Sequence, residues 1–238
     1  VLAEAELPLK MARPGWPLLG VISDAPALAR TLKSIELLYQ GLPLPLAVAE
    51  LTPDSLPTDS TRLSAAAGLI VQGNAASQLT AAQREAVLSW VRGGGHILIA
   101  GGTAAAEAAK ILPDGALPVS FAGSAGATST EPLRGGVPAA ATLPASAPAA
   151  RLQPTGGEVL AGPPEAPLVW RTQVGSGTVT LMAFDPSLEP LASWDGSPAL
   201  LQEALAPALP QNPEGMGRFP GGFPDAAVRL QSALMTLP

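Results

Sequence analysis

The sequence predicts an α/β fold of three layers, in which helices cover both faces of a mostly parallel, doubly wound sheet. Two apolar runs, 68–72 and 96–100, flank a segment with helical spacing that begins at Thr80 and ends at three glycines. Short apolar runs bounded by turn residues are typical of buried strands, and the order strand, helix, strand predicts a parallel crossover. The second run ends in the tight turn Gly101-Gly102, where sheets of this kind often bind ligands.

Length and composition predict one large domain with short extensions. The chain of 238 residues is 47% hydrophobic, so it can bury about 70–75% of the surface that its unfolded form exposes. We expect a lead-in strand at 1–13, an α/β domain at 14–209 that contains a small β-rich insertion near 113–167, and a Pro/Gly-rich tail at 210–238 with one last short helix.

The first half of the chain alternates between apolar runs and helical patterns. The expected strands are 16–22, 44–51, 68–72 and 96–100, and the expected helices follow Asp24, Thr80 and Gly102. The first helix carries an apolar stripe that extends to Tyr39, and 52–64 is expected to be a loop with one helical turn. Thr80 and Gln83 form a capping box, because each side chain can satisfy a free first-turn N–H group.

The second half is richer in β-structure. Short strands are expected at 119–122, 151–153 and 159–161, followed by a hairpin of 168–174 and 178–184 around a glycine turn. Ser197 is then predicted to cap a final helix, with Pro198 in its first turn.

Composition excludes several classes of function. The net charge of −6 and the scattered basic residues argue against nucleic-acid binding, which depends on clustered lysine and arginine. The absence of cysteine excludes disulfides, thiolate metal sites and a cysteine nucleophile, and it suits an oxidising compartment. No run of about 18 apolar residues predicts a membrane span. No cofactor or metal motif is present, so we expect neither.

Two segments resemble a known family. They read LTAAQREAVLSWVRGGGHILIAGG and GSGTVTLMAFDPSLEPLASW, and together they are similar to class I glutamine amidotransferase-like domains of uncharacterised bacterial membrane-anchored proteins. The resemblance covers about residues 16–209 and implies a flavodoxin-like fold. It also implies a place outside the cytoplasmic membrane, with the anchor in a segment that these 238 residues do not include.

The same resemblance does not carry over the amidotransferase activity. Working members need a cysteine at the turn after the strand, assisted by a histidine and a glutamate. Here that turn reads Ala100-Gly101-Gly102-Thr103. His96 lies at the other end of the strand, about 15 Å away at the usual rise per residue.

Topology supplies the candidate site. Ligands of open α/β sheets bind beyond the carboxyl ends of the strands, where the strand order reverses. The residues expected at these ends are Ser23, Asp24, Gly73, Asn74, Gly101, Gly102, Thr103 and Asp185. Glycines allow a ligand to approach the backbone closely, and a helix that begins at Thr103 would offer N–H groups to an anion. The alternative is structural: Asp24 and Asp185 as caps, and Asn74 and the glycines as turn residues.

Other residues suggest weaker alternatives. Asp24 and Asp185 could form a carboxylate pair for acid–base chemistry, but no calcium-type spacing accompanies them. His96, the only histidine, is expected to lie at the surface or at a strand start. The four tryptophans fit core positions, with Trp194 the one that could line a groove.

The sequence therefore predicts a non-catalytic domain that binds an unknown protein or small ligand. A carboxylate-dependent hydrolase and a structural spacer with an apolar partner surface stay open as alternatives.

Overall fold

The computed structural model describes residues 17–24, 26–34, 37–39, 42–44, 46–136 and 142–209. The predicted lead-in strand at 1–13 and the predicted tail at 210–238, with its short helix, lie outside the described residues. The strands are β1 (Leu18–Ile22), β2 (Leu37–Tyr39), β3 (Leu42–Leu44), β4 (Ala47–Leu51), β5 (Gly68–Val71), β6 (His96–Ala100), β7 (Val119–Ser129), β8 (Ser146–Pro154), β9 (Glu158–Ala161), β10 (Val169–Val174) and β11 (Gly177–Met182). The α-helices are α1 (Ala27–Ser34), α2 (Ala81–Arg92), α3 (Ala105–Ala108) and α4 (Ser197–Leu205).

A seven-stranded sheet forms the centre of the molecule, in the order β4-β1-β5-β6-β11-β10-β9. The first five strands run parallel, and β10 and β9 extend the sheet in antiparallel fashion. The predicted α/β class with a mostly parallel sheet is confirmed.

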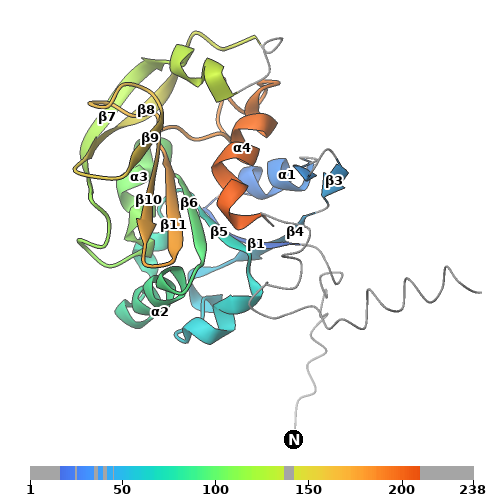
Figure 1. Cartoon of the computed structure of the whole chain (residues 1–238), viewed down its shortest axis with the longest axis vertical. Helices are drawn as coiled ribbons and strands as arrows, with labels where there is room; N and C mark the ends of the chain where they lie inside the picture. The colour runs from blue at the N-terminus through green and yellow to red at the C-terminus, as the bar shows by residue number, and fades with distance from the viewer. Residues whose placement is uncertain are drawn as a thin grey trace, which may run out of the picture.

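Helices cover both faces of this sheet (Figure 1). Helices α1 and α4 pack on one face, and α2 packs on the other. β5 and β6 are buried along their whole length, which explains why they read as continuous apolar runs. Among the described residues no helix is long and apolar enough to cross a membrane.

Local sequence signals predicted several elements correctly. Helix α2 begins with the predicted capping box, in which the Thr80 hydroxyl accepts from the Gln83 N–H at 3.3 Å and Gln83 Oε1 accepts from the Thr80 N–H at 2.9 Å. The predicted hairpin is present as β10 and β11, with Gly175 at a positive φ in its turn.

The segment predicted as a β-rich insertion divides into two parts. β7 and β8 pair as a separate long hairpin, seen beside the main sheet in Figure 1. β9 belongs to the main sheet instead, where it pairs with β10 at the edge. The three short strands expected between residues 119 and 161 therefore exist, but one of them completes the central layer.

Three local predictions were wrong. Tyr39 lies in β2 and not on the first helix, which ends at Ser34. The strand expected over 44–51 is divided between β3 and β4. Ser197 is the first residue of α4, after the N-cap Gly196, and its hydroxyl donates to the carbonyl of Leu191.

Candidate functional site

The carboxyl ends of β1, β5, β6 and β11 lie along one edge of the sheet, because neighbouring strands in this part of the sheet run parallel. All the predicted site residues follow these four ends. The strand order reverses between β1 and β5, since the chain passes from β1 to β4 on one side and then to β5 on the other. Such a reversal is the usual place for a ligand in an open α/β sheet.

A buried glutamine joins three of the strand ends. Gln72 directly follows β5 and is 4% exposed. Its amide oxygen accepts a hydrogen bond from the Ser23 hydroxyl at 2.7 Å, and its amide nitrogen donates to Asp185 Oδ2 at 2.6 Å. The same nitrogen donates to the hydroxyl oxygen of Ser187 at 2.5 Å. The amide thereby fixes the ends of β1, β5 and β11 relative to one another.

Asp185 is held by its own turn as well. Its Oδ1 accepts from the backbone N–H of Ser187 at 2.8 Å and from the Ser187 hydroxyl at 2.7 Å. Both carboxylate oxygens therefore accept hydrogen bonds, from the residue's own turn and from Gln72 across the sheet edge.

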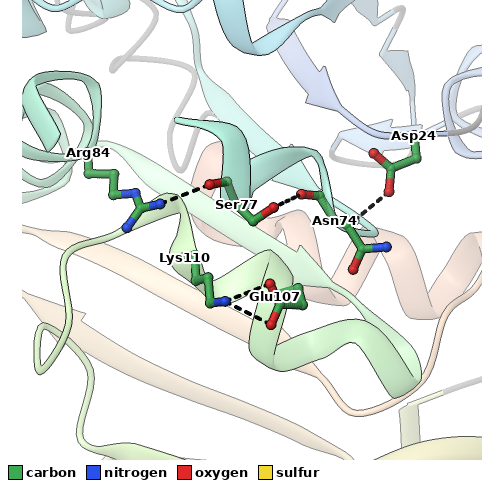
Figure 2. Close-up of polar contacts among 6 residues, drawn as sticks. All are labelled: Asp24, Asn74, Ser77, Arg84, Glu107 and Lys110. Atoms are coloured by element: carbon green, nitrogen blue, oxygen red, sulfur yellow. Dashed lines mark hydrogen bonds and ion pairs between the residues drawn. The ribbon is translucent and has the colours of Figure 1, made fainter. Parts of the chain in front are cut away.

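A second set of contacts lies at the strand reversal itself (Figure 2). Asp24 Oδ2 accepts from the backbone N–H of Asn74 at 2.5 Å, and the Ser77 hydroxyl donates to the carbonyl oxygen of Asn74 at 2.7 Å. Arg84 Nη2 donates to the Ser77 carbonyl at 3.2 Å. Asp24 thus bonds across to the loop after β5. The side-chain amide of Asn74 is exposed and makes no contact with the other residues drawn in Figure 2.

Two glycines allow these close approaches. Gly73 has a φ of +70°, and a Cβ atom there would lie 2.5 Å from Asp24 Oδ2. Gly102 has a φ of +51°, and a Cβ atom there would lie 3.0 Å from both the backbone nitrogen and the Cβ of Asp185. Both positions favour glycine for their left-handed backbone as well as for space.

The turn after β6 differs from its prediction. A helix was expected from Thr103, but the chain forms a 3-10 turn at Gly102–Ala104, the four-residue α3, and another 3-10 turn at Ala109–Ile111. A helix this short provides no developed positive end for an anion. Gly101 and Gly102 are buried, whereas the Thr103 side chain is exposed.

His96 begins β6, as predicted, but its side chain is 1% exposed and lies far from the strand ends that carry the site. Within the described ranges neither ring nitrogen makes a hydrogen bond of good geometry, although the backbone at Ala204 and Thr178 is near enough to favour the charged form slightly. Burial, together with the positive charge of Arg171, lowers the pKa of His96 to about 4. The imidazole is therefore neutral at pH 7.

The chemistry available at the strand ends is that of hydrogen bonding. The described part of the chain contains no group of three or more histidine, aspartate or glutamate residues that could hold a metal ion. Trp194, considered for a groove, is buried at 6% exposure. The exposed groups at the site are the Asp24 carboxylate, the Asn74 amide and the Thr103 hydroxyl.

Sequence reasoning missed Gln72 and Ser187 as members of the site. Gln72 carried a usable signal, because it is a polar residue directly after a buried apolar run. Ser187 follows Asp185 by two positions, the spacing at which an aspartate side chain accepts from the backbone in an Asx-turn. The contact between the two residues, which are 115 positions apart, had no signal in one sequence.

Comparison with known proteins gives a likeness of fold. No protein-family model matches the sequence, and no curated protein matches it. Among solved structures, the chain is similar to two cytoplasmic proteins of Salmonella typhimurium, STM3548 at a TM-score of 0.57 with 12% identity, and STM1381 of strain LT2 at 0.53 with 15% identity. In both cases the match covers 79% of this chain and 98% of the other.

A weaker likeness links the chain to part of a larger enzyme. The exo-beta-1,4-mannosidase Op5Man5 from Opitutaceae bacterium strain TAV5 matches 81% of this chain but only 35% of its own length, at a TM-score of 0.45 and 17% identity. The two Salmonella proteins support the α/β fold alone, and the mannosidase match is too weak to support any argument.

Proposed function

We propose that this chain is a non-catalytic binding domain that takes a ligand at the carboxyl ends of β1 and β5. The observation that carries the proposal is the arrangement at the strand reversal. There Asp24 and Asn74 present exposed polar side chains, with the exposed Thr103 after the neighbouring strand β6, while the hydrogen bonds of the buried Gln72 hold the strand ends in place. A rigid support beneath exposed hydrogen-bonding groups is what a selective site needs.

The strand order supports a finer assignment of fold within this proposal. Numbered along the chain, the five parallel strands lie in the order 2-1-3-4-5, which is the order of flavodoxin-like sheets. This order agrees with the flavodoxin-like fold that the resemblance to class I glutamine amidotransferase-like domains implies.

We place the domain on the outer side of a bacterial membrane, as part of a membrane-tethered protein. The resemblance and the absence of cysteine support this location. The two Salmonella proteins are named as cytoplasmic, so the location needs its own test. An alkaline phosphatase fusion to the full-length protein reports it, because that enzyme is active only after export; an inactive fusion would place the domain in the cytoplasm.

The hydrolase alternative receives less support from the geometry. A general base must lie within reach of the substrate, but the Asp185 side chain is only partly exposed and is held from within the protein by two hydrogen bonds to Oδ1 and one to Oδ2. Asp24 Oδ2 likewise accepts from Asn74. The two carboxylates belong to separate sets of hydrogen bonds, and each set fixes the backbone.

A thermal-shift screen tests the binding proposal. The protein is heated with nucleotides, sugars, amino acids, peptidoglycan fragments and divalent cations in turn. A ligand present at 100 times its dissociation constant adds about 2.7 kcal/mol to the free energy of unfolding. We expect at least one stabilising compound, with its effect lost in Asp24→Asn and Asn74→Ala.

The matched control is Gln153→Ala, which removes an exposed amide on β8, away from the site. This variant is expected to keep the full shift. A stabilising compound that acts equally on all variants would overturn the location of the site. A blank screen would favour the spacer alternative over a small-ligand site.

A further inference from the structure

A hollow of about 590 Å³ lies on the face of the sheet that α2 covers only in part. The connection from β4 to β5 crosses this face through two 3-10 turns, Pro53–Ser55 and Ser60–Ala65, where a parallel crossover usually has an α-helix. The slender connection leaves space beneath it. The size falls within the range of about 300–1,000 Å³ typical of ligand sites.

The walls of the hollow combine apolar and polar groups, with the apolar ones in a slight majority. Its floor includes Ala49 and Leu51 from β4 and Leu69 from β5, and Leu56 and Leu63 of the crossing segment form the other side. The small Ala49 side chain lies directly opposite Gly20 in the register of β1 and β4. A Cβ atom at Gly20 would lie 2.7 Å from Leu69 Cδ2 and 2.8 Å from Leu51 Cδ1, so these leucines cover the glycine and the small side chain of the floor is that of Ala49.

The hollow is bordered by β4, the edge strand of the sheet among the described residues. β4 is the last strand on its side of the seven-stranded sheet, so within the described ranges its outer edge has no paired strand. The N–H of Ala47 donates to the carbonyl of Pro17 at 3.0 Å, toward β1. Because N–H groups alternate in direction along a strand, those of Val48 and Glu50 point to the open edge.

Two charges at the hollow select among possible occupants. Asp54 and Arg62 both line it, and within the described part of the chain neither side chain makes a hydrogen bond or an ion pair with the other or with a third residue. The Arg62 charge reaches Asp59 only at long range; the low pKa of Asp59 is due chiefly to the hydrogen bonds from Thr61. A fatty acid would leave Asp54 without a partner. A peptide, with an ammonium group and a carboxylate, complements both charges.

We propose that β4 and this hollow form a binding site for an extended apolar peptide of about five residues with a free amino terminus. The peptide adds as a further strand along β4, and every second side chain enters the hollow beside Ala49. Main-chain hydrogen bonds supply affinity in this mode of recognition, and the pocket for alternate side chains supplies selectivity. The five residues of β4 span about 17 Å, which sets the length of the peptide. The inference concerns a different surface from the strand-end site and does not depend on it.

The test uses the pentapeptide Ala-Val-Leu-Val-Ala with free termini as the probe. Isothermal titration is expected to show binding, and hydrogen exchange followed by NMR is expected to show slower exchange at the amides of Val48 and Glu50. Ala49→Leu fills the hollow and is expected to weaken binding at least tenfold, and Asp54→Asn and the N-acetylated probe are each expected to weaken it about fivefold.

Matched controls separate these effects from loss of folding. Ala106→Leu and Asp114→Asn make the same chemical changes at exposed positions outside the hollow, and both are expected to bind the probe within twofold of the unchanged protein. Asp54 is itself exposed, so Asp54→Asn tests the proposal even where Ala49→Leu folds poorly.

Three results would overturn the proposal: no binding at millimolar probe, binding without protection of Val48 and Glu50, or equal binding by Ala49→Leu and Ala106→Leu. A version of the chain that lacks residues 1–13 gives the last check, since it is expected to bind the probe equally well. Binding that appears only in this shortened chain would identify the chain's own residues 1–13 as the occupant of the site. The thermal-shift screen tests the site at the strand ends, and the peptide titration tests the hollow beside β4. Asp24 does not line the hollow, so either proposal can fail without the other.

Discussion

At the carboxyl ends of the parallel strands the buried polar side chain is Gln72, and its amide makes three hydrogen bonds. At the amino end of β6 the buried polar side chain is His96, and among the described residues neither of its ring nitrogens has a well-placed partner. The two residues lie in the same sheet and are almost equally buried, at 4% and 1% exposure. Only the first is surrounded by groups that match its donors and acceptors.

This difference indicates separate roles for the two ends. A satisfied buried amide stabilises one arrangement of the strand ends, because any other arrangement would leave its polar atoms unpaired. An imidazole without partners is tolerated only while it is neutral. The hydrogen bonds at the carboxyl ends therefore fix the positions of the strand ends. The amino end of β6 is packed under α4, and we expect protonation of His96 in acid to destabilise this packing.

The largest expected effect follows from His96. Its folded-state pKa of about 4 lies below its unfolded value of 6.5, so the unfolded chain binds a proton that the folded chain rejects. The free energy of unfolding is therefore unaffected by His96 above about pH 6.5 and decreases as the pH falls. Below about pH 4 the decrease reaches its full value of about 3 kcal/mol. Urea unfolding between pH 7.5 and 4 measures this loss.

The variant His96→Leu isolates that contribution from the carboxylates, which titrate in the same range. We expect the variant to lose less stability than the unchanged protein on acidification, by about 3 kcal/mol. If the free energy of unfolding decreased equally with pH in the two proteins, protonation of His96 would cost nothing. The proposed difference between the Gln72 end and the His96 end of the sheet would then be wrong.

The next largest effect is expected at the carboxyl ends of the strands, where Gln72 has hydrogen-bond partners. Gln72→Leu keeps the volume of the side chain but leaves Ser23, Asp185 and Ser187 without their shared partner. Loss of hydrogen bonds to buried or partly buried groups is expected to lower the free energy of unfolding by roughly 2–3 kcal/mol at pH 7. Gln173→Leu, an exposed glutamine on β10, is the control and is expected to change stability by less than about 0.5 kcal/mol. Equal effects would mean that the network contributes nothing to stability.

The contrast between Gln72 and His96 also shows where sequence reasoning succeeds. Strands β5 and β6 and the cap of α2 were predictable, because a run of apolar residues or a Thr-x-x-Gln pattern is determined by near neighbours. The burial of His96 was not, because it depends on α4, a helix about 100 positions away. The eight predicted site residues lie at the carboxyl edge of the sheet, since parallel strands bring their ends together whatever the side chains are.

The same limit explains the remaining differences. β9 was predicted as a strand from its own residues, but its place in the main sheet depends on β10. Trp194 precedes Asp195-Gly196 and was the tryptophan considered for a groove, yet the fold buries it.

A smaller effect is expected at Gly102, where backbone strain and crowding can be separated. Gly102→Ala places a methyl group in a left-handed backbone and 3.0 Å from the backbone nitrogen of Asp185. Gly115→Ala imposes similar strain at a φ of +76° with no atom within 4 Å, and is expected to cost about 1 kcal/mol. Gly102→Ala is expected to cost about 1 kcal/mol more, because the Asp185 turn must move. If thermal unfolding showed the same loss of stability in both variants, the Asp185 turn would be able to move at no cost.

The smallest effects are expected at the exposed side chains of the carboxyl ends. Asn74→Ala and Thr103→Val remove polar groups that lie at the surface, and each is expected to change the free energy of unfolding by less than about 0.5 kcal/mol. The comparison with Gln72→Leu is the informative one. If the buried amide contributes to stability and the exposed groups do not, the exposed groups are available for a ligand without a penalty to the fold. A loss above 1 kcal/mol in Asn74→Ala would instead assign that side chain to the turn after β5 and weaken the case for a binding site there.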